Sequence, residues 1–333
     1  MTSVKIKLPH LTDRDMAKPA TGRTAKIWRD GQLVNWDDAT IHVMSHVVHY
    51  GSGLFEGVRC YETPNGGAIF RAREHMRRLV DSCNIYRMPL QYSVDELVQG
   101  MSDVVAANEL RECYLRPLVI RTGETMGVFG AKLPVEVFMI AWKSAGPYLG
   151  HEALEHGADV RVSTWRRAAP NTFPMMAKAG GNYMNSQLSI MEARVDEYAE
   201  GIMLDSFGFV AEGSGENLFA VRDGCMYTAP LGAGILQGIT RDTVITIARD
   251  LGLELREQVI PREFLYVVDE LFFCGTAAEI TPIRSVDRIE IGTGKPGPVT
   301  LRIQKEYLGI AKGQIPDRHG WLTMVPEPVA AMR

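Results

Sequence analysis

Lys178 stands out among the residues that could do chemistry. It is the only lysine between Lys143 and Lys295, and its neighbours in the segment 175–183 (MMAKAGGNY) are mostly small or apolar. A lysine kept out of water has a depressed pKa and can be a neutral amine near pH 7, the form that bonds to a carbonyl compound or to pyridoxal phosphate. The alternative is a lysine at a helix start whose stem covers apolar surface while its ammonium reaches water.

An enzyme that uses pyridoxal phosphate also needs a carboxylate for the pyridine nitrogen, and Glu212 is a candidate. It stands in the segment 210–217 (VAEGSGEN), beside Gly213 and Gly215, which allow a backbone to approach a ligand closely. Its charge would keep the ring nitrogen protonated, so that the ring withdraws electrons from the substrate's Cα. From the motif alone, a carboxylate in a surface turn is an equal alternative.

A phosphate site is the third requirement. Gly238, Ile239 and Thr240 open a predicted helix, whose free N–H groups and positive dipole end suit a phosphate. Thr276 follows a predicted buried strand and would add a hydroxyl; the alternative for Thr240 is an ordinary N-cap. An arginine could complete the site. The residues alone do not choose among four candidates: Arg71, Arg73, Arg77 and Arg78.

Composition narrows the class of protein. The 333 residues are 46% hydrophobic and 23% charged, which is typical of a globular protein long enough for two domains. The net charge of −4 provides no positive field for nucleic acid or an anionic membrane, and no stretch is long and apolar enough to span one. Five scattered cysteines and the lack of a signal-like start predict a cytoplasmic protein.

The elements that must position these residues fall into two groups. In the first half, hairpin, capping and periodicity signals predict strands at 26–29, 32–36, 54–61, 68–70, 113–121 and 135–142, and helices at 73–87 and 93–108. In the second half, they predict strands at 158–165, 201–205, 218–222, 225–228, 254–260 and 270–274, and helices at 182–198, 239–251 and 298–310. The turn-prone segment near 144–150 predicts a boundary. The domains are therefore expected to be an N-terminal extension (1–25), a small α+β domain (26–143), a linker (144–157) and a larger domain (158–333).

Two other patterns carry little weight. His42, His46 and His49 have no carboxylate or thiolate partner in a segment expected to be extended, so no metal is predicted. The segment 51–57 (GSGLFEG) has glutamate where a dinucleotide fingerprint has its third glycine, so no nicotinamide cofactor is predicted.

Taken together, the segments resemble the branched-chain amino acid aminotransferases, which are fold-type IV pyridoxal phosphate enzymes. The resemblance spans the chain from about Lys26 and rests on these motifs: 49–51 (HYG), 54–59 (LFEGVR), 70–76 (FRAREHM), 114–117 (YLRP), 177–183 (AKAGGNY), 212–219 (EGSGENLF), 238–241 (GITR) and 275–282 (GTAAEITP). It implies a mixed α+β fold of two domains, the second larger and β-barrel-like.

The resemblance also implies roles around the cofactor, pyridoxal 5'-phosphate. Lys178 would form the internal aldimine and then move the proton between Cα and the cofactor. Glu212 would pair with the pyridine nitrogen and Tyr183 would bind the phenolic oxygen. The phosphate would lie against Arg78, Ile239, Thr240 and Thr276.

For the substrate, the resemblance implies an apolar wall that suits leucine, isoleucine or valine, with Arg116 and tyrosine hydroxyls ready for the side-chain carboxylate of glutamate. Backbone N–H groups of residues 276–278 would hold the α-carboxylate. The implied substrate residues are Tyr50, Phe55, Arg59, Tyr114, Arg116, Val128, Tyr148, Thr276, Ala277 and Ala278.

The implied reaction is ping-pong transfer of an amino group from a branched-chain L-amino acid to 2-oxoglutarate. Val128 would lie on a loop that reaches the neighbouring subunit's pocket, which implies an obligate homodimer or a larger oligomer built from it. The alternatives are a D-amino acid or (R)-amine transaminase of the same fold, or an aminodeoxychorismate-type lyase.

Overall fold

A hairpin opens the described part of the chain. The computed structural model describes residues 22–143 and 146–326, and its first strands are β1 (Lys26–Arg29) and β2 (Gln32–Asn35). They pair antiparallel around Asp30 and Gly31, whose φ angles of 43° and 86° suit a two-residue hairpin turn. The predicted hairpin is confirmed.

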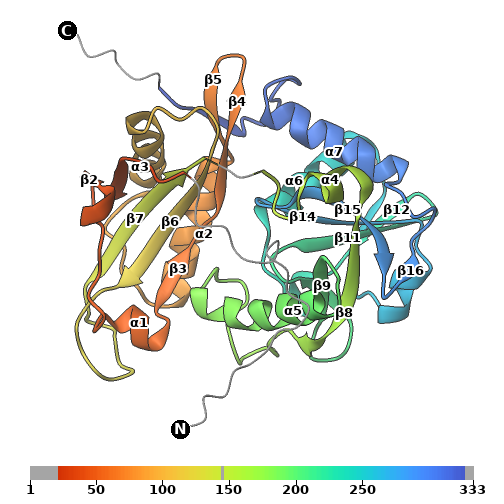
Figure 1. The fold of residues 1–333 in the computed structure, drawn as a ribbon, viewed down its shortest axis with the longest axis horizontal. Helices are drawn as coiled ribbons and strands as arrows, with labels where there is room; N and C mark the ends of the chain where they lie inside the picture. The colour runs from red at the N-terminus through yellow and green to blue at the C-terminus, as the bar shows by residue number, and fades with distance from the viewer. Residues whose placement is uncertain (1–21, 144–145, 327–333) are drawn as a thin grey trace.

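The first sheet is antiparallel throughout and occupies the left half of Figure 1. Its order is β17-β5-β4-β6-β7-β1-β2, with β3 beside β6. The further strands are β3 (Gly53–Phe55), β4 (Val58–Thr63), β5 (Gly66–Phe70), β6 (Cys113–Arg121), β7 (Val135–Trp142) and β17 (Leu322–Met324). The predicted single strand over 54–61 is thus two strands, interrupted at Glu56 and Gly57.

Two helices bury one face of this sheet. They are α2 (Ala72–Ile85) and α3 (Val94–Ala107), and α3 begins with the predicted capping box between Ser93 and Glu96. Met76 and Leu79 of α2 and Leu97 of α3 are fully buried in one cluster with strand residues such as Leu115. The apolar stripes of the helices therefore form the core of this half.

The second sheet closes on itself. Its order is β10-β9-β8-β15-β14-β11-β12-β13, with β16 beside β15, and an additional pairing joins β10 to β11. The strands are β8 (Ala158–Arg166), β9 (Glu200–Leu204), β10 (Val210–Gly213), β11 (Asn217–Arg222), β12 (Cys225–Thr228), β13 (Leu255–Glu257), β14 (Glu270–Gly275), β15 (Glu279–Val286) and β16 (Ile289–Glu290). The β10–β11 pair completes a ring of six strands, which confirms the expected barrel-like second half.

The long helices of the second half are α5 (Tyr183–Val195), α6 (Ile239–Asp250) and α7 (Pro298–Ala311). Val244 of α6 and Tyr307 of α7 share a buried cluster with Tyr61 and Phe70 of the first sheet. Because one apolar cluster includes residues of both sheets, the two halves pack directly on each other.

The end of the chain returns to the first sheet. Strand β17 pairs with β5, with Leu322 opposite Phe70. The proposed larger domain, residues 158–333, thus contributes a strand to the smaller one. Short helices are α1 (His46–Tyr50) and α4 (His151–His156), and the 3-10 turns are Trp36–Asp38, Gly180–Asn182, Leu231–Ala233 and Arg262–Tyr266. Within residues 22–143 and 146–326, no helix has the length and apolarity to cross a membrane.

Candidate active site

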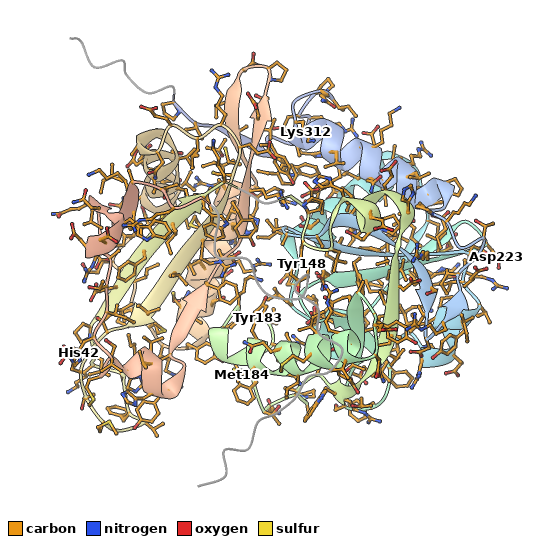
Figure 2. All side chains as sticks on the ribbon, in the orientation of Figure 1. His42, Tyr148, Tyr183, Met184, Asp223 and Lys312 are labelled. Atoms are coloured by element: carbon orange, nitrogen blue, oxygen red, sulfur yellow. The ribbon has the colours of Figure 1, made fainter. Side chains whose placement is uncertain are left out.

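The predicted chemistry gathers in one cavity between the two halves of the chain. Figure 2 shows Tyr148 and Tyr183 in this central region. The deeper part is lined by the predicted cofactor residues Arg78, Lys178, Tyr183, Glu212, Ile239, Thr240 and Thr276. The adjoining outer part is a cavity of about 440 Å³ lined by predicted substrate residues Phe55, Arg59, Tyr114, Arg116, Tyr148, Thr276 and Ala277, and also by Lys178 and Tyr183. Lys178 therefore borders both parts.

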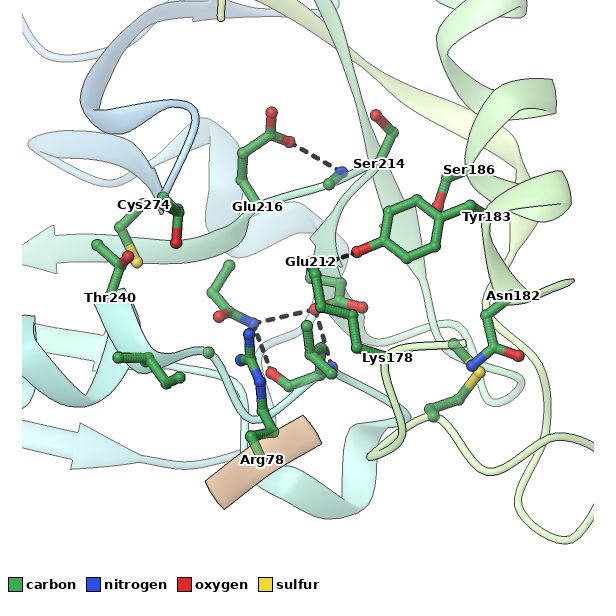
Figure 3. Close-up of a pocket in the computed structure, with 18 of the residues that line it drawn as sticks. Arg78, Lys178, Asn182, Tyr183, Ser186, Glu212, Ser214, Glu216, Thr240 and Cys274 are labelled. Carbon is green, nitrogen blue, oxygen red and sulfur yellow. Dashed lines mark hydrogen bonds between the residues drawn. The ribbon is translucent and has the colours of Figure 1, made fainter. Parts of the chain in front are cut away.

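The backbone of Lys178 is held from two sides. Its N–H donates to Ser82 Oγ of α2 at 3.1 Å, and its carbonyl accepts from the Phe55 N–H of β3 at 3.0 Å. Its half-buried side chain points to Tyr183, with Nζ 2.6 Å from Tyr183 Oη (Figure 3). The position places a lysine amine beside a phenol at the centre of the cavity.

Glu212 lies at the floor of the deeper part on β10 and is almost fully buried. Its Oε2 accepts from Asn217 Nδ2 and from the Leu236 N–H, both at 3.0 Å, and its Oε1 is 2.6 Å from the Arg167 guanidinium. Burial raises the pKa of Glu212, and Arg167, the Leu236 N–H and Lys178 oppose that rise. A cation bound beside this carboxylate would further favour its charged form.

Helix α6 presents its N-terminus to the same cavity. Gly238 is the N-cap residue, no side chain caps the helix, and Ile239 and Thr240 are buried. A Cβ on Gly238 would come within 1.9 Å of Asn217 Oδ1, so this position needs glycine. A buried helix start with free N–H groups is a site for an anion.

Arg78 of α2 faces this helix start from the other half of the chain. Its Nε and Nη2 each donate to the Glu56 carboxylate at 2.7 Å, and its Nη1 donates to the Gln237 carbonyl at 2.9 Å. His75 Nδ1 is 2.8 Å from Glu56 Oε2. Although burial opposes ionisation, Arg78 and His75 hold the pKa of Glu56 well below its usual range. Glu56 is thus a buried anion that orients Arg78.

Arg116 of β6 stands among aromatic rings in the outer part. Its guanidinium carbon lies 4.7 Å from the Phe55 ring centroid, 5.7 Å from that of Tyr114 and 6.0 Å from that of Trp142. Its Nε is buried without a hydrogen-bond partner. Such a donor is expected to have a partner when a ligand is bound, and a carboxylate would suit it.

The loop between β14 and β15 is held by Arg59. Its Nε donates to the Thr276 carbonyl at 2.8 Å and its Nη2 to the Ala277 carbonyl at 3.0 Å. Tyr148 donates its N–H to the Ala277 carbonyl at 3.1 Å. Arg59 therefore lines the cavity as predicted, while the hydrogen bonds it makes there orient the loop. Ala278, the last residue of this loop, is in contrast fully buried and does not line the cavity.

Two predicted substrate residues lie outside this cavity. Tyr50 and Val128 belong to α1 and to the loop between β6 and β7, where the Gly127 N–H donates to Tyr50 Oη at 3.0 Å. Val128 is 81% exposed. Figure 2 shows His42 on this same side of the molecule, away from Tyr148. Neither residue contacts the substrate cavity of its own chain.

Sequence analysis missed several residues that the geometry brings to the site. Arg167 pairs with Glu212, Glu56 pairs with Arg78, and Trp142 borders Arg116. Each contact joins residues distant in the chain, so spacing alone carries no signal for it. The exception is Glu56, which stood in a recognised motif without an assigned role.

Two carboxylates, Glu216 and Glu200, interact at one side of the cavity. Glu216 lines it, and Glu200 is fully buried with its Oε1 2.7 Å from the Gly201 N–H and its Oε2 without a hydrogen-bond partner. Burial raises the pKa of Glu200 to about 7. Hydrogen bonds from the Gly201 N–H and from Ser214, and the charge of Arg194, oppose that rise. Burial, and next the charge of Glu200, raise the pKa of Glu216 as well.

This shift predicts a pH-dependent stability. Between the ordinary pKa of a glutamate and about 7, the folded state retains a proton on Glu200 that the unfolded state has lost, so the free energy of unfolding falls as pH rises through this window. We expect Glu200→Gln to be more stable than the parent protein at pH 8 by a few degrees in Tm, and nearly equal to it at pH 4.5. Thermal unfolding at both pH values measures this; an equal difference in Tm at both would contradict it.

The histidine segment does not form a metal site. His46 begins helix α1 instead of lying in an extended segment, and its ring contacts Ser52 Oγ at 2.7 Å and the Gly127 carbonyl at 3.1 Å. In the part of the chain that the structure describes, no three His, Cys, Asp or Glu side chains are grouped as metal ligands.

Comparisons with known proteins agree with the geometry. The family model for amino-transferase class IV matches residues 53–286. The chain is 51% identical over 308 residues to the branched-chain-amino-acid aminotransferase of Escherichia coli K12, covering 92% of this chain and 99% of that protein. It is 46% identical over 303 residues to the enzyme of that name from Pseudomonas aeruginosa, covering 91% and 98%.

Solved structures give the same result. The crystal structure of the E. coli branched-chain amino acid aminotransferase matches with a TM-score of 0.89 at 51% identity, covering 91% of this chain and all of that one. The crystal structure of a second branched-chain amino acid aminotransferase, from T.th., is complexed with N-(5'-phosphopyridoxyl)-L-glutamate. It matches with a TM-score of 0.87 at 43% identity, covering 91% of this chain and 99% of that one.

Proposed function

The chain belongs to the amino-transferase class IV family, and from this premise we propose that it uses pyridoxal phosphate to transfer the amino group of L-leucine, L-isoleucine or L-valine to 2-oxoglutarate. One observation carries the proposal. Lys178 Nζ and the Arg116 guanidinium carbon lie 5.0 Å and 4.7 Å from the centroid of the same ring, Phe55. An amine for the chemistry and a cation for an acidic substrate thus border one apolar surface.

The residues present fit pyridoxal phosphate. The uncapped, buried N-terminus of α6 and Arg78 suit its phosphate, and the buried carboxylate of Glu212 suits its pyridine nitrogen. Lys178 and Tyr183 line the same part of the cavity, and their amine and phenol would suit the cofactor's aldehyde and phenolic oxygen. When bound, the cofactor supplies an aldehyde that combines with amines and a ring that withdraws electrons from the substrate's Cα.

The protein's own groups then have separate tasks. Lys178 Nζ, which borders both parts of the cavity, takes the proton from the substrate's Cα and returns it. Glu212 would hold a proton on the ring nitrogen of the bound cofactor, and Arg167 and Asn217 hold Glu212 in place. The N–H groups of the loop after β14, oriented by Arg59, bind the α-carboxylate.

One cavity must accept both an apolar and an acidic side chain. The rings of Phe55, Tyr114 and Trp142 suit the branched side chain. Arg116, which lies among the same rings with an unpartnered Nε, suits the second carboxylate of glutamate or 2-oxoglutarate.

Arg116→Met is therefore expected to impair the reaction with 2-oxoglutarate much more than the reaction with L-leucine. Since a charge-assisted pair is worth about 1.5–3 kcal/mol, we expect kcat/KM for 2-oxoglutarate to fall on the order of 10- to 100-fold. The single-turnover rate with L-leucine should change by about threefold or less, since its side chain carries no charge. Arg116→Lys, which keeps the charge without the planar fork, is the matched control and should lose less. Equal losses with both substrates would contradict this role of Arg116.

Donor choice tests the proposed function against its alternatives. The purified yellow protein is titrated with L-leucine, D-alanine and (R)-1-phenylethylamine while its absorbance is followed. We expect only L-leucine to bleach the colour, with 2-oxoglutarate restoring it. Bleaching by D-alanine or the amine would favour the other transaminases, and pyruvate release from aminodeoxychorismate would favour a lyase.

We infer that the working form is a homodimer. Exposed apolar side chains lie on α1, the β6–β7 loop and α5, namely Val48, Met126, Val128, Phe129, Met184 and Met191. In Figure 1 these three elements lie along the same lower side of the molecule, and Figure 2 labels Met184 on α5. A surface of this kind is typical of a subunit interface. It supports the idea that Val128 and Tyr50 complete the partner's cavity.

The five cysteines are buried and form no disulfide bonds, which supports a cytoplasmic location.

The dimer gives a direct mass prediction. Light scattering during gel filtration should give twice the chain mass, or a whole multiple of that value, for the parent protein. Phe129→Asp with Met184→Asp should shift the mass toward one chain because charge enters an apolar interface. The control is the double variant Phe207→Asp with Val267→Asp, which changes two exposed residues outside this surface and should leave the mass unchanged. A parent protein of single-chain mass would contradict the inference.

A further inference from the structure

The phosphate end of the cavity is assembled from two distant parts of the chain. Arg78 belongs to α2 in the first half, while Ile239 and Thr240 belong to α6 in the second. In Figure 1, α2 lies against the first sheet and α6 against the barrel. A site divided in this way keeps its geometry only if something fixes α6 against α2.

Arg71 makes that connection. It is the N-cap residue of α2 and is 7% exposed, although it lies in the half of the molecule opposite α6. Its Nη1 donates to Asp242 Oδ2 at 2.8 Å and to Thr243 Oγ1 at 3.0 Å, both in the first half of α6. Its Nε donates to Glu74 Oε1 of α2 at 2.8 Å. One guanidinium thus binds both helices at once.

The contact continues to the residues that line the phosphate end. Thr243 Oγ1, which accepts from Arg71, itself donates to the Ile239 carbonyl at 2.9 Å. Ile239 is the first residue of α6 and lines the cavity. Two hydrogen bonds therefore join Arg71 to the helix start that is to face the phosphate.

Two further features hold Arg71 itself. Its guanidinium carbon lies 5.0 Å from the Trp321 ring centroid, and its N–H donates to the Trp321 carbonyl at 2.7 Å. Its backbone is left-handed, with φ of 53°, which a residue with a Cβ adopts only at a cost. The surrounding contacts thus fix both the backbone and the plane of the guanidinium.

Resting on the proposed use of pyridoxal phosphate, we propose that Arg71 is a positioning residue that assembles the phosphate site by fixing the start of α6 against α2. It touches neither the substrate cavity nor the reacting groups. Its loss weakens binding of the phosphate group and leaves the rest of the cofactor's contacts as they are.

The test compares two ligands that differ only in the phosphate. Apo-protein is titrated with pyridoxal 5'-phosphate and, separately, with pyridoxal, for the parent protein and for Arg71→Met. We expect the Kd for pyridoxal 5'-phosphate to rise about tenfold, as is common when a supporting contact of a binding residue is lost, and the Kd for pyridoxal to stay within about twofold. At saturating cofactor, kcat and the KM for L-leucine should be unchanged.

Three variants complete the design. Arg71→Lys should show a smaller rise, because an ammonium cannot bind both helices in one plane. Thr243→Val, nearly equal in shape, removes the acceptor and should raise the Kd about threefold, which keeps the test open if Arg71→Met does not fold. Asp250→Asn perturbs the far end of α6, where it binds Arg318, and should leave both Kd values unchanged.

The outcomes are distinct. A selective loss of affinity for the phosphorylated ligand supports the positioning role. Unchanged affinities in folded Arg71→Met, or in Thr243→Val, would overturn it, as would an equal loss for both ligands. If the parent protein itself binds no pyridoxal 5'-phosphate, the proposed function fails instead.

Discussion

Replacing Lys178 by alanine is expected to lower kcat with L-leucine and 2-oxoglutarate on the order of 10⁴-fold or more. The variant loses the amine that moves the Cα proton and the group that holds the aldehyde, and each of these tasks alone is worth several powers of ten. Lys178 makes none of the hydrogen bonds that hold Arg78 and Glu212, so the variant should still bind pyridoxal 5'-phosphate. Steady-state rates and a binding titration measure the two effects.

The control for this prediction is another lysine. Lys305, exposed on α7, is changed to alanine, and kcat should stay within about twofold of the parent value. A Lys178→Ala protein that is folded, binds the cofactor and keeps more than about one hundredth of the parent kcat would show that another group moves the proton.

The second large effect is expected for Glu212→Gln. A neutral amide cannot hold a proton on the ring nitrogen, so the single-turnover rate with L-leucine should fall by about 10²- to 10³-fold. The cofactor should remain bound, because Arg78 and the start of α6 are untouched. Stopped-flow absorbance measures the rate.

The change also leaves Arg167 without its buried counterion, so stability must be separated from chemistry. Glu257→Gln is the matched control, since Glu257 lies 2.6 Å from the buried Arg241 outside the cavity. It should lose stability without losing rate. A Glu212→Gln protein with an unchanged rate would exclude the ring-nitrogen role of Glu212.

Local patterns predicted much of the fold. The hairpin around Asp30 and Gly31 and the helix that follows Ser93 depend on short-range hydrogen bonds and turn geometry, which neighbouring residues determine. The missed strand β15 contains Pro282, which is unusual inside a sheet; it pairs with Phe272 of β14, while pairing with β8 begins only at Ile283. The β10–β11 pair that closes the barrel is a local hairpin, in which the Gly213 N–H donates to the Glu216 carbonyl at 2.7 Å. The pairings of β8 with β15 and of β11 with β14 join strands far apart in the chain, and no local pattern predicts them.

The residues of the site also fall into those that local motifs predicted and those that only the folded chain brings together. Lys178, Glu212 and the start of α6 stand in short motifs whose composition already favours their chemistry. The buried partners Glu56 and Arg167 act across 22 and 45 positions of sequence, so only the folded chain brings them together. Tyr50 and Val128 lie outside their own cavity because, as we propose, a second copy of the chain is needed to complete the site.

The central claim is that Lys178 Nζ is the atom that carries the cofactor. Borohydride reduces an imine between a lysine and the cofactor's aldehyde to a stable secondary amine. Digestion of the treated yellow holoenzyme, followed by mass spectrometry, then shows which lysine carries the cofactor. We predict the added mass of the reduced cofactor on Lys178 and on no other lysine. Cofactor fixed to a different lysine, or a peptide containing Lys178 recovered without it, would contradict the account.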